Sequence, residues 1–274
     1  MKFSVLSYNV LHGTGAARLL RGRPSGSPAW AQDRLVRAAE LVQQLAPDVA
    51  CLQEVCPVAE AALERVLGED YARAAVYRNE ELPPKDGCAT FVRKSRLEVV
   101  RTHSFRLRDS AERHFPAAAE IRGRAAGFAS ALWRELHEKL TLSVALQLRP
   151  VAGGADAPSR DSGSAGANDF CVATSHLYWD PRYPDLKLLQ AYLLAQELER
   201  FAGELPLVLA GDLNSTPLAD GRSSGEGELS GVYSLLMRGV VDIRHPHHPV
   251  LLRRGAGILS AVLRWSCPLR RAHV

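Results

Sequence analysis

The chain repeats one pattern, in which a short apolar run that is typical of a buried strand ends in polar side chains. The clearest example lies in residues 206–217, where the apolar run 207–210 breaks at Gly211 and is followed by Asp212 and Asn214. Side chains alternate along an extended chain, so Asp212 and Asn214 project from the same rim. The pattern therefore predicts a strand that presents a carboxylate and a carboxamide together at its end.

Three other apolar runs have the same form, and each predicts a strand with a polar end. These endings are Asn9 in residues 3–11, Glu54 in residues 48–55 and His176 in residues 170–177. Strand ends that meet at one edge are where α/β and β-sandwich enzymes build their sites. We therefore expect Asn9, Glu54, His176, Asp212 and Asn214 to share one site.

The remaining elements follow from apolar spacing and from turn residues. Helical spacing predicts helices over residues 30–45, 57–67, 128–137, 184–201 and 231–238. Further strands are expected at residues 71–77 on a sheet edge, at 88–95, at 97–103 as the hairpin partner of 88–95, and at 140–148. The Gly-, Ala- and Ser-rich stretch at about residues 151–169 predicts a disordered insertion within one domain of residues 1–245, which a divergent tail of residues 246–274 follows.

Composition narrows the class of protein. With 274 residues, 46% hydrophobic and 23% charged, the chain has the profile of a globular α/β protein with a large core. No apolar run approaches the roughly 20 residues of a membrane span, so no membrane association is expected. A net charge of +4 is compatible with an anionic partner without identifying one. Five cysteines without a Cys-x-x-Cys pair predict reduced thiols and a cytoplasmic location, with nuclear and mitochondrial locations left open.

The polar strand ends have a chemical interpretation and an ordinary structural one. A carboxylate at the end of an inner strand needs a partner, which is either a metal ion or an arginine. Taken singly, Asn9 could cap a turn, His176 could bond to a backbone carbonyl, and Asp212 could belong to a solvated turn. Several such endings in one chain favour a shared site. By contrast, His245, His247 and His248 alternate with prolines and indicate a loop rather than a metal cluster.

The motifs at these strand ends resemble those of the endonuclease/exonuclease/phosphatase superfamily, which folds like pancreatic DNase. The matching strings, in the family's order, are SYNV at residues 7–10, LQEV at 52–55, SH at 175–176 and GDLNS at 211–215. Residues 86–91 and 175–190 further resemble the poly(A)-deadenylase branch, which includes the nuclease of the cytoplasmic deadenylase complex, Nocturnin, the Angel proteins and the mitochondrial 2′-phosphodiesterase. The resemblance covers about residues 1–245.

The resemblance implies an α/β (α+β) fold, with two mixed β-sheets in a sandwich and helices outside, and a metal-dependent hydrolase. Glu54 would ligate the catalytic Mg²⁺, for which Mn²⁺ is a substitute. Asn9 and Asp212 would help to hold the metal and to orient the phosphate or the attacking water. A site with few carboxylates suits Mg²⁺, which keeps several of its waters.

The resemblance also implies roles in substrate binding. His176 would donate to a phosphate oxygen, Asn214 would contact the scissile phosphate or the terminal adenine, and Pro181 would pack against a base. Trp179 is expected to be a packing residue. The implied function is a Mg²⁺-dependent 3′–5′ exoribonuclease that removes poly(A) from single-stranded RNA, with proteins of a deadenylase complex as candidate partners.

The chain departs from the family near its C-terminus. The family has a strand with a catalytic Asp and a final Ser-Asp-His whose Asp and His polarise the attacking water, and residues 246–274 contain neither; His273 does not follow an Asp. Losing that pair should lower the rate of hydrolysis by several orders of magnitude. Two alternatives therefore stay open: a phosphodiesterase or phosphatase of small nucleotides, and a catalytically inactive RNA-binding relative.

Overall fold

We describe the protein from a computed structural model, for residues 2–11, 28–77, 86–115, 128–151, 168–221, 226–252 and 264–266. The chain forms two compact units. Unit 1 comprises residues 1–104, 144–176 and 205–212, and unit 2 comprises residues 105–143, 177–204 and 213–274. Within the described ranges, no helix has both the length and the apolar character that crossing a membrane requires.

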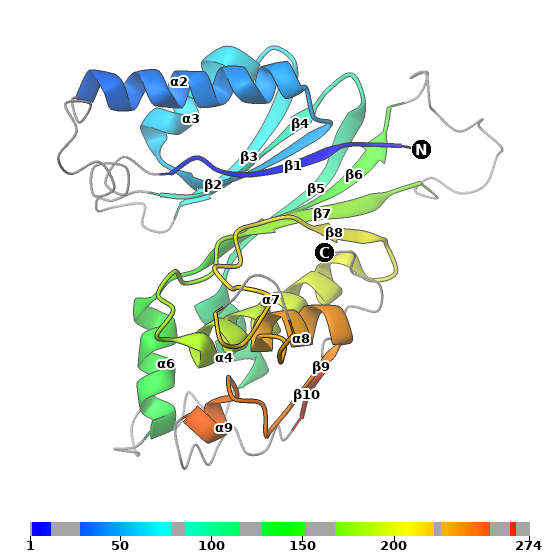
Figure 1. Cartoon of the computed structure of the whole chain (residues 1–274). Helices are drawn as coiled ribbons and strands as arrows, with labels where there is room; N and C mark the ends of the chain where they lie inside the picture. The colour runs from blue at the N-terminus through cyan, green and yellow to red at the C-terminus, as the bar shows by residue number, and fades with distance from the viewer. Residues whose placement is uncertain are drawn as a thin grey trace. The chain divides into compact units, whose positions relative to one another are not determined.

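Unit 1 contains two four-stranded sheets (Figure 1). The first has the order β1-β2-β4-β3 and the second the order β5-β6-β7-β8. The strands are β1 (Val5–Asn9), β2 (Val49–Val55), β3 (Tyr71–Tyr77), β4 (Gly87–Arg93), β5 (Leu97–Arg106), β6 (Leu142–Pro150), β7 (Phe170–Ser175) and β8 (Leu207–Leu209). β1 is parallel to β2 and β7 is parallel to β8, whereas β4 is antiparallel to both β2 and β3. The first sheet is therefore mixed.

The predicted hairpin between residues 88–95 and 97–103 is wrong. β4 pairs with β2 and β3, while β5 belongs to the other sheet, where it is an edge strand. The turn at residues 94–96 therefore leads the chain from one sheet to the other. A short turn between two strands predicts that they are close, but the pairing partners are decided by which faces pack together.

Two apolar layers hold unit 1 together. Between the sheets, a buried cluster joins side chains of the first sheet, such as Cys51 and Val92, to side chains of the second, such as Leu146 and Val172. On the outer face of the first sheet, α2 (Pro28–Leu45) and α3 (Pro57–Leu67) cover a second cluster that includes Leu52 and Phe91. The expected α/β sandwich with helices outside is thus confirmed.

Unit 2 is built around one helix, α7 (Pro184–Ala202). It packs against α4 (Leu107–His114), α6 (Phe128–Glu138), α8 (Gly231–Arg238) and α9 (Pro249–Leu252). The unit also contains β9 (Val240–Asp242) and β10 (Arg264–Ser266), which pair in antiparallel fashion. Residues 188–198 of α7 supply core side chains, as their helical spacing predicts. Neither α4 nor the β9–β10 pair was predicted.

A buried ion pair ties α7 to α4. The carboxylate of Glu197 on α7 is fully buried and accepts hydrogen bonds from Arg113 Nε at 3.1 Å and Arg113 Nη2 at 2.5 Å. Arg200 is a second cationic partner. Burial alone would raise the pKa of Glu197, but the hydrogen bonds and charges of the two arginines lower it overall. The carboxylate therefore stays charged and links the two helices.

Two predicted segments lie largely outside the described residues. Residues 152–167 of the predicted insertion are among them, while Asp169 at its end is buried and accepts a hydrogen bond from Arg149 Nε at 2.8 Å. In the predicted tail, residues 253–263 and 267–274 are not described. The described parts of that tail are the turn after His245, α9 and β10.

The three neighbouring histidines of unit 2 form a structural loop, as the prolines among them indicate. His245 is buried, and its Nε2 donates to the backbone carbonyl of Leu229 at 2.8 Å. His247 accepts from the backbone N–H of Gly231 through Nδ1 at 3.1 Å and donates from Nε2 to the carbonyl of Ala219 at 3.1 Å. This pattern requires a neutral ring for His247 with its proton on Nε2.

We expect the stability of unit 2 to depend on pH through His247 and His248. Burial is the main cause that lowers the pKa of His247 and of His248 from the usual value of 6.5. For His247, the hydrogen bond to the carbonyl of Ala219 and the charge of Glu228 oppose this lowering, whereas the charges of His245 and Lys187 add to it. Below about pH 6.5 the unfolded chain takes up protons that the folded chain does not, so stability is lost as the pH falls.

The measurement is the free energy of unfolding from urea titrations between about pH 7.5 and about pH 5.5. His247→Gln should be less stable at pH 7.5 but should lose less stability on acidification than the unchanged chain. Leu235→Val on α8, which weakens the core of unit 2 without changing a titratable group, is the control and should keep the full dependence. If His247→Gln and the unchanged chain lose stability in parallel, His247 is not a source of the effect.

Candidate functional site

Four rows of side chains face the space between the sheets of unit 1, and all change from apolar to polar towards one rim. Alternation along each strand defines the rows. They are Val5–Ser7–Asn9, Val49–Cys51–Gln53, Phe170–Val172–Thr174–His176 and Val208–Ala210–Asp212. The hydrogen bonds from Asn9 to Asp212 and from Gln53 to Thr174 show that the polar ends meet. Three predicted site residues therefore arrive at one place by strand geometry alone.

Glu54 reaches this rim because β2 carries a bulge. Gln53 pairs with Cys88 and Val55 pairs with Gly87, so Glu54 is an extra residue, with φ of 55°. Leu52 and Val55 both lie in the apolar cluster on the outer face of the first sheet. Without the bulge, regular alternation would place Glu54, and not Val55, on that outer face. The bulge thus frees a charged side chain from the core, and strained backbone of this kind is often found at functional sites.

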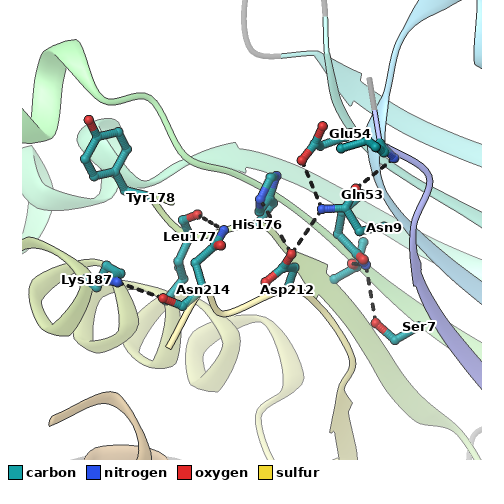
Figure 2. Close-up of polar contacts among 12 residues, drawn as sticks. Ser7, Asn9, Gln53, Glu54, His176, Leu177, Tyr178, Lys187, Asp212 and Asn214 are labelled. Atoms are coloured by element: carbon teal, nitrogen blue, oxygen red, sulfur yellow. Dashed lines mark hydrogen bonds and ion pairs between the residues drawn. The ribbon is translucent and has the colours of Figure 1, made fainter. Parts of the chain in front are cut away.

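The amide of Asn9 links the two carboxylates (Figure 2). Asn9 Nδ2 donates to Glu54 Oε1 at 3.0 Å and to Asp212 Oδ2 at 3.0 Å. Its Oδ1 accepts the backbone N–H of Leu11 at 2.9 Å, which fixes the orientation of the amide. On the other side of Asp212, His176 Nε2 lies 3.9 Å from Asp212 Oδ2. Glu54 and Asp212, which are far apart in the sequence, therefore share one partner.

Gly211 allows β7 and β8 to approach closely next to the site. The backbone N–H of Asp212 donates to the carbonyl of Ser175 at 3.0 Å, and His176 pairs with Asp212 as an isolated parallel bridge. A Cβ atom on Gly211 would lie 2.3 Å from Ser175 O and 2.8 Å from Ser175 N. Only glycine fits there. The glycine that ends the apolar run in the sequence is therefore required for the two strands to pack.

The side chains at this rim fit a hard divalent cation. Glu54 and Asp212 offer carboxylate oxygens within 3.0 Å of one amide nitrogen, and the Asp212 side chain is 32% exposed. Magnesium suits such a site because it binds to one or two carboxylates and keeps several waters. No group of three or more His, Cys, Asp or Glu residues suited to a metal occurs in the described part of the chain.

Asn214 and Pro181, the other predicted site residues, belong to unit 2. Asn214 has a φ of 46°, its Nδ2 donates to Leu177 O at 2.8 Å, and its carbonyl accepts from Lys187 Nζ at 2.7 Å. Lys187 lies on α7 and is only 6% exposed, so an ammonium group is buried to hold this turn. Sequence reasoning missed Lys187, although a lysine between Leu186 and Leu188 of a buried helix is a signal that could have found it.

The prediction that Trp179 is a packing residue is wrong. Its side chain is 60% exposed, although the loop around it is well held. Asp180 is buried and accepts from the backbone N–H of Arg182 at 3.0 Å and from Arg182 Nη2 at 2.6 Å. Pro181 is exposed in the same loop. The loop thus presents an aromatic ring and a proline to solvent, and their roles in substrate binding stay predictions.

Comparison with known proteins places the chain among nucleases and phosphatases. A model of the endonuclease/exonuclease/phosphatase family matches residues 6–231. Carbon catabolite repressor protein 4 homolog 1 of Arabidopsis thaliana is 28% identical over 267 residues, which cover 94% of this chain and 40% of that protein. The CCR4-Not complex 3′-5′-exoribonuclease subunit Ccr4 of Aspergillus clavatus is 28% identical over 312 residues, which cover 95% of this chain and 41% of that protein. The chain thus spans about two fifths of the length of these relatives.

The fold is also similar to that of a solved structure. The crystal structure of ANGEL2, a 2′,3′-cyclic phosphatase, in complex with adenosine-2′,3′-vanadate, matches with a TM-score of 0.62 at 23% identity and covers 92% of this chain and 63% of that one. Similarity at this identity establishes the fold alone. Because the family model covers most of the sequence, from within β1 to the start of α8, the chain belongs to the endonuclease/exonuclease/phosphatase family.

Proposed function

We propose that the chain is a magnesium-dependent phosphodiester hydrolase that removes nucleotides from the 3′ end of single-stranded RNA, with poly(A) as the preferred substrate. The main support for the proposal is that, in a chain of this family, the amide of Asn9 donates hydrogen bonds to both Glu54 and Asp212. The relatives' names support the substrate class, because one of them is called a 3′-5′-exoribonuclease subunit of the CCR4-Not complex.

The residues at the rim divide the work of hydrolysis. Glu54 and Asp212 would hold Mg²⁺, which supplies positive charge to the phosphoryl oxygens and lowers the pKa of a bound water. Asn9 would keep the two carboxylates oriented through its two hydrogen bonds, or orient the phosphate or the attacking water. His176, whose side chain is 9% exposed, would donate to a phosphoryl oxygen as negative charge develops there. In unit 2, Asn214 would contact the scissile phosphate or the terminal adenine, and Pro181 would pack against a base.

The rate of the chain by itself is expected to be low. The sequence has no Ser-Asp-His string, which the family resemblance associates with polarising the attacking water. Charge stabilisation and positioning remain, and these contribute to catalysis without a general base. We therefore expect slow but metal-dependent turnover.

A small-nucleotide phosphodiesterase or phosphatase is the second candidate. It is favoured by the shared fold with ANGEL2, whose structure is described as that of a 2′,3′-cyclic phosphatase. The third candidate is an RNA-binding relative without activity, and the assay below distinguishes it from the other two. The first two candidates would both use the rim, so an assay must decide between their substrates.

The test compares substrates with the purified chain. We expect 5′-AMP to be released from oligo(A) in the presence of Mg²⁺ or Mn²⁺ and not in EDTA. Faster hydrolysis of a 2′,3′-cyclic phosphate, NADP(H) or 2′,5′-linked oligoadenylate would support the second candidate instead. Binding of single-stranded RNA without metal-dependent turnover would support the third. Association with proteins of a deadenylase complex and a cytoplasmic location stay predictions.

A further inference from the structure

A second polar layer lies directly beneath the candidate site in unit 1. It consists of Ser7 on β1, Gln53 on β2 and Thr174 on β7. Gln53 is 1% exposed and Thr174 is fully buried. Gln53 Nε2 donates to Thr174 Oγ1 at 2.9 Å and to Cys51 O at 3.0 Å, and Ser7 Oγ lies 3.5 Å from the same nitrogen. The Gln53–Thr174 bond crosses from the first sheet to the second.

Each member of this layer is next to a site residue. Ser7 is two residues before Asn9 and Thr174 is two residues before His176, so each faces the same way as the site residue above it. Gln53 pairs directly with Asn9 and precedes the bulged Glu54. Its carbonyl accepts the backbone N–H of Val10 at 3.0 Å. The layer is therefore connected to both strands that carry Asn9 and Glu54, and to the strand that leads to His176.

An apolar residue would serve the core at least as well as Gln53. The residues below it in the same row are Val49 and Cys51, which lie in the apolar cluster between the sheets. A buried amide there needs its hydrogen bonds, and losing one partner costs about 1–3 kcal/mol. Buried polar pairs of this kind gain specificity rather than stability, because only one alignment of the two sheets satisfies them.

We propose that Gln53 is a positioning residue, which through its hydrogen bond to Thr174 aligns β1 and β2 with β7 at the rim. Asn9 and Glu54 on the first sheet are thereby held in place towards His176 and Asp212 on the second. The structural part of this inference stands by itself, and only its kinetic consequence rests on the proposed function.

The test removes the hydrogen bond between Gln53 and Thr174 by changing Thr174, so that no residue of the candidate site is changed. Thr174→Val keeps the volume of the side chain and removes the acceptor of Gln53. Thr90→Val on β4 is the matched control. Thr90 is buried to the same extent on the same face of the first sheet, but it pairs with Cys51 and so lies further from the rim than Gln53. Thr174→Ser keeps the hydroxyl group and should behave as the unchanged chain.

Amide hydrogen exchange measures how well the two sheets are held together at the rim, and it needs neither substrate nor metal. The reporters are Val10 N–H, bonded to Gln53 O, and Asp212 N–H, bonded to Ser175 O, while Val49 N–H, bonded to Ser4 O, marks the other end of the strands. In Thr174→Val we expect exchange at Val10 and Asp212 to be about tenfold faster, with Val49 nearly unchanged. Thr90→Val should show no such selective change.

If the chain is active, kcat and KM on oligo(A) provide the second measurement. Thr174→Val should lower kcat on oligo(A) by about 10- to 100-fold with little change in KM, because misplacement by about 1 Å can cost that much. Equal acceleration of exchange at Val10, Asp212 and Val49, or none at all, would show that Gln53 serves the fold alone. An inactive unchanged chain would defeat the proposed function, while the exchange pattern would still decide this inference.

Discussion

Glu54→Gln is expected to lower the rate of oligo(A) hydrolysis by roughly a thousandfold, with the fold intact. Glutamine has the same shape, and its Oε1 can still accept the hydrogen bond that Asn9 Nδ2 donates at 3.0 Å. The change therefore removes a negative charge and little else. A neutral carboxamide attracts a divalent cation much less than a carboxylate does, so binding of the metal and stabilisation of the phosphoryl charge both suffer.

The measurements are the release of 5′-AMP and the rise in melting temperature on adding Mg²⁺. Glu40→Gln on the exposed side of α2 is the matched control, because it makes the same chemical change away from the site. Glu54→Gln should lose both the activity and the magnesium-dependent rise, whereas Glu40→Gln should keep both. Equal release of 5′-AMP by Glu54→Gln and the unchanged chain would remove Glu54 from the mechanism.

Gly211→Ala is expected to lower the free energy of unfolding by about 3 kcal/mol or more, the largest loss among the substitutions proposed here. The added methyl group would lie 2.3 Å from Ser175 O, which is backbone and cannot rotate away. β7 and β8 must then separate, which weakens the bond from Asp212 N–H to Ser175 O and moves the Asp212 carboxylate. At about 2–4 °C per kcal/mol for a chain of this size, the melting temperature should fall by about 10 °C.

Thermal unfolding checks this expectation, with Gly203→Ala as the matched control. Gly203 has a φ of 59° and nothing within 4 Å of an added Cβ atom, so alanine there brings backbone strain without a clash. Its cost should be about 1–2 kcal/mol from this strain. If Gly211→Ala were no less stable than Gly203→Ala, the close approach of β8 to Ser175 would not be a constraint on the fold.

Much of the candidate site could be predicted because it depends on local periodicity. Alternation places Asn9, His176 and Asp212 at the ends of rows that face the same interior, and the apolar runs identify the strands. Helical spacing likewise identified α7, which is buried over most of its length. These features need only the sequence near each residue, so they could be predicted without knowing the fold.

Other features depend on contacts between distant segments. The pairing of β5 was mispredicted because sheet order is decided by which faces pack, and the exposure of Trp179 depends on what covers it. Asp180, bonded to Arg182, and the buried Lys187 likewise acquire their roles only in the folded unit 2.

The sequence by itself therefore determined the strands, their polar ends and the family, because side-chain alternation and short motifs are local properties. Only the tertiary structure decided that Glu54 leaves the core through a bulge, that Asn9 joins it to Asp212, and that Gln53 bonds to Thr174. The physical reason is that a bulge and a hydrogen bond between sheets are set by how whole sheets align, which no single stretch of sequence specifies.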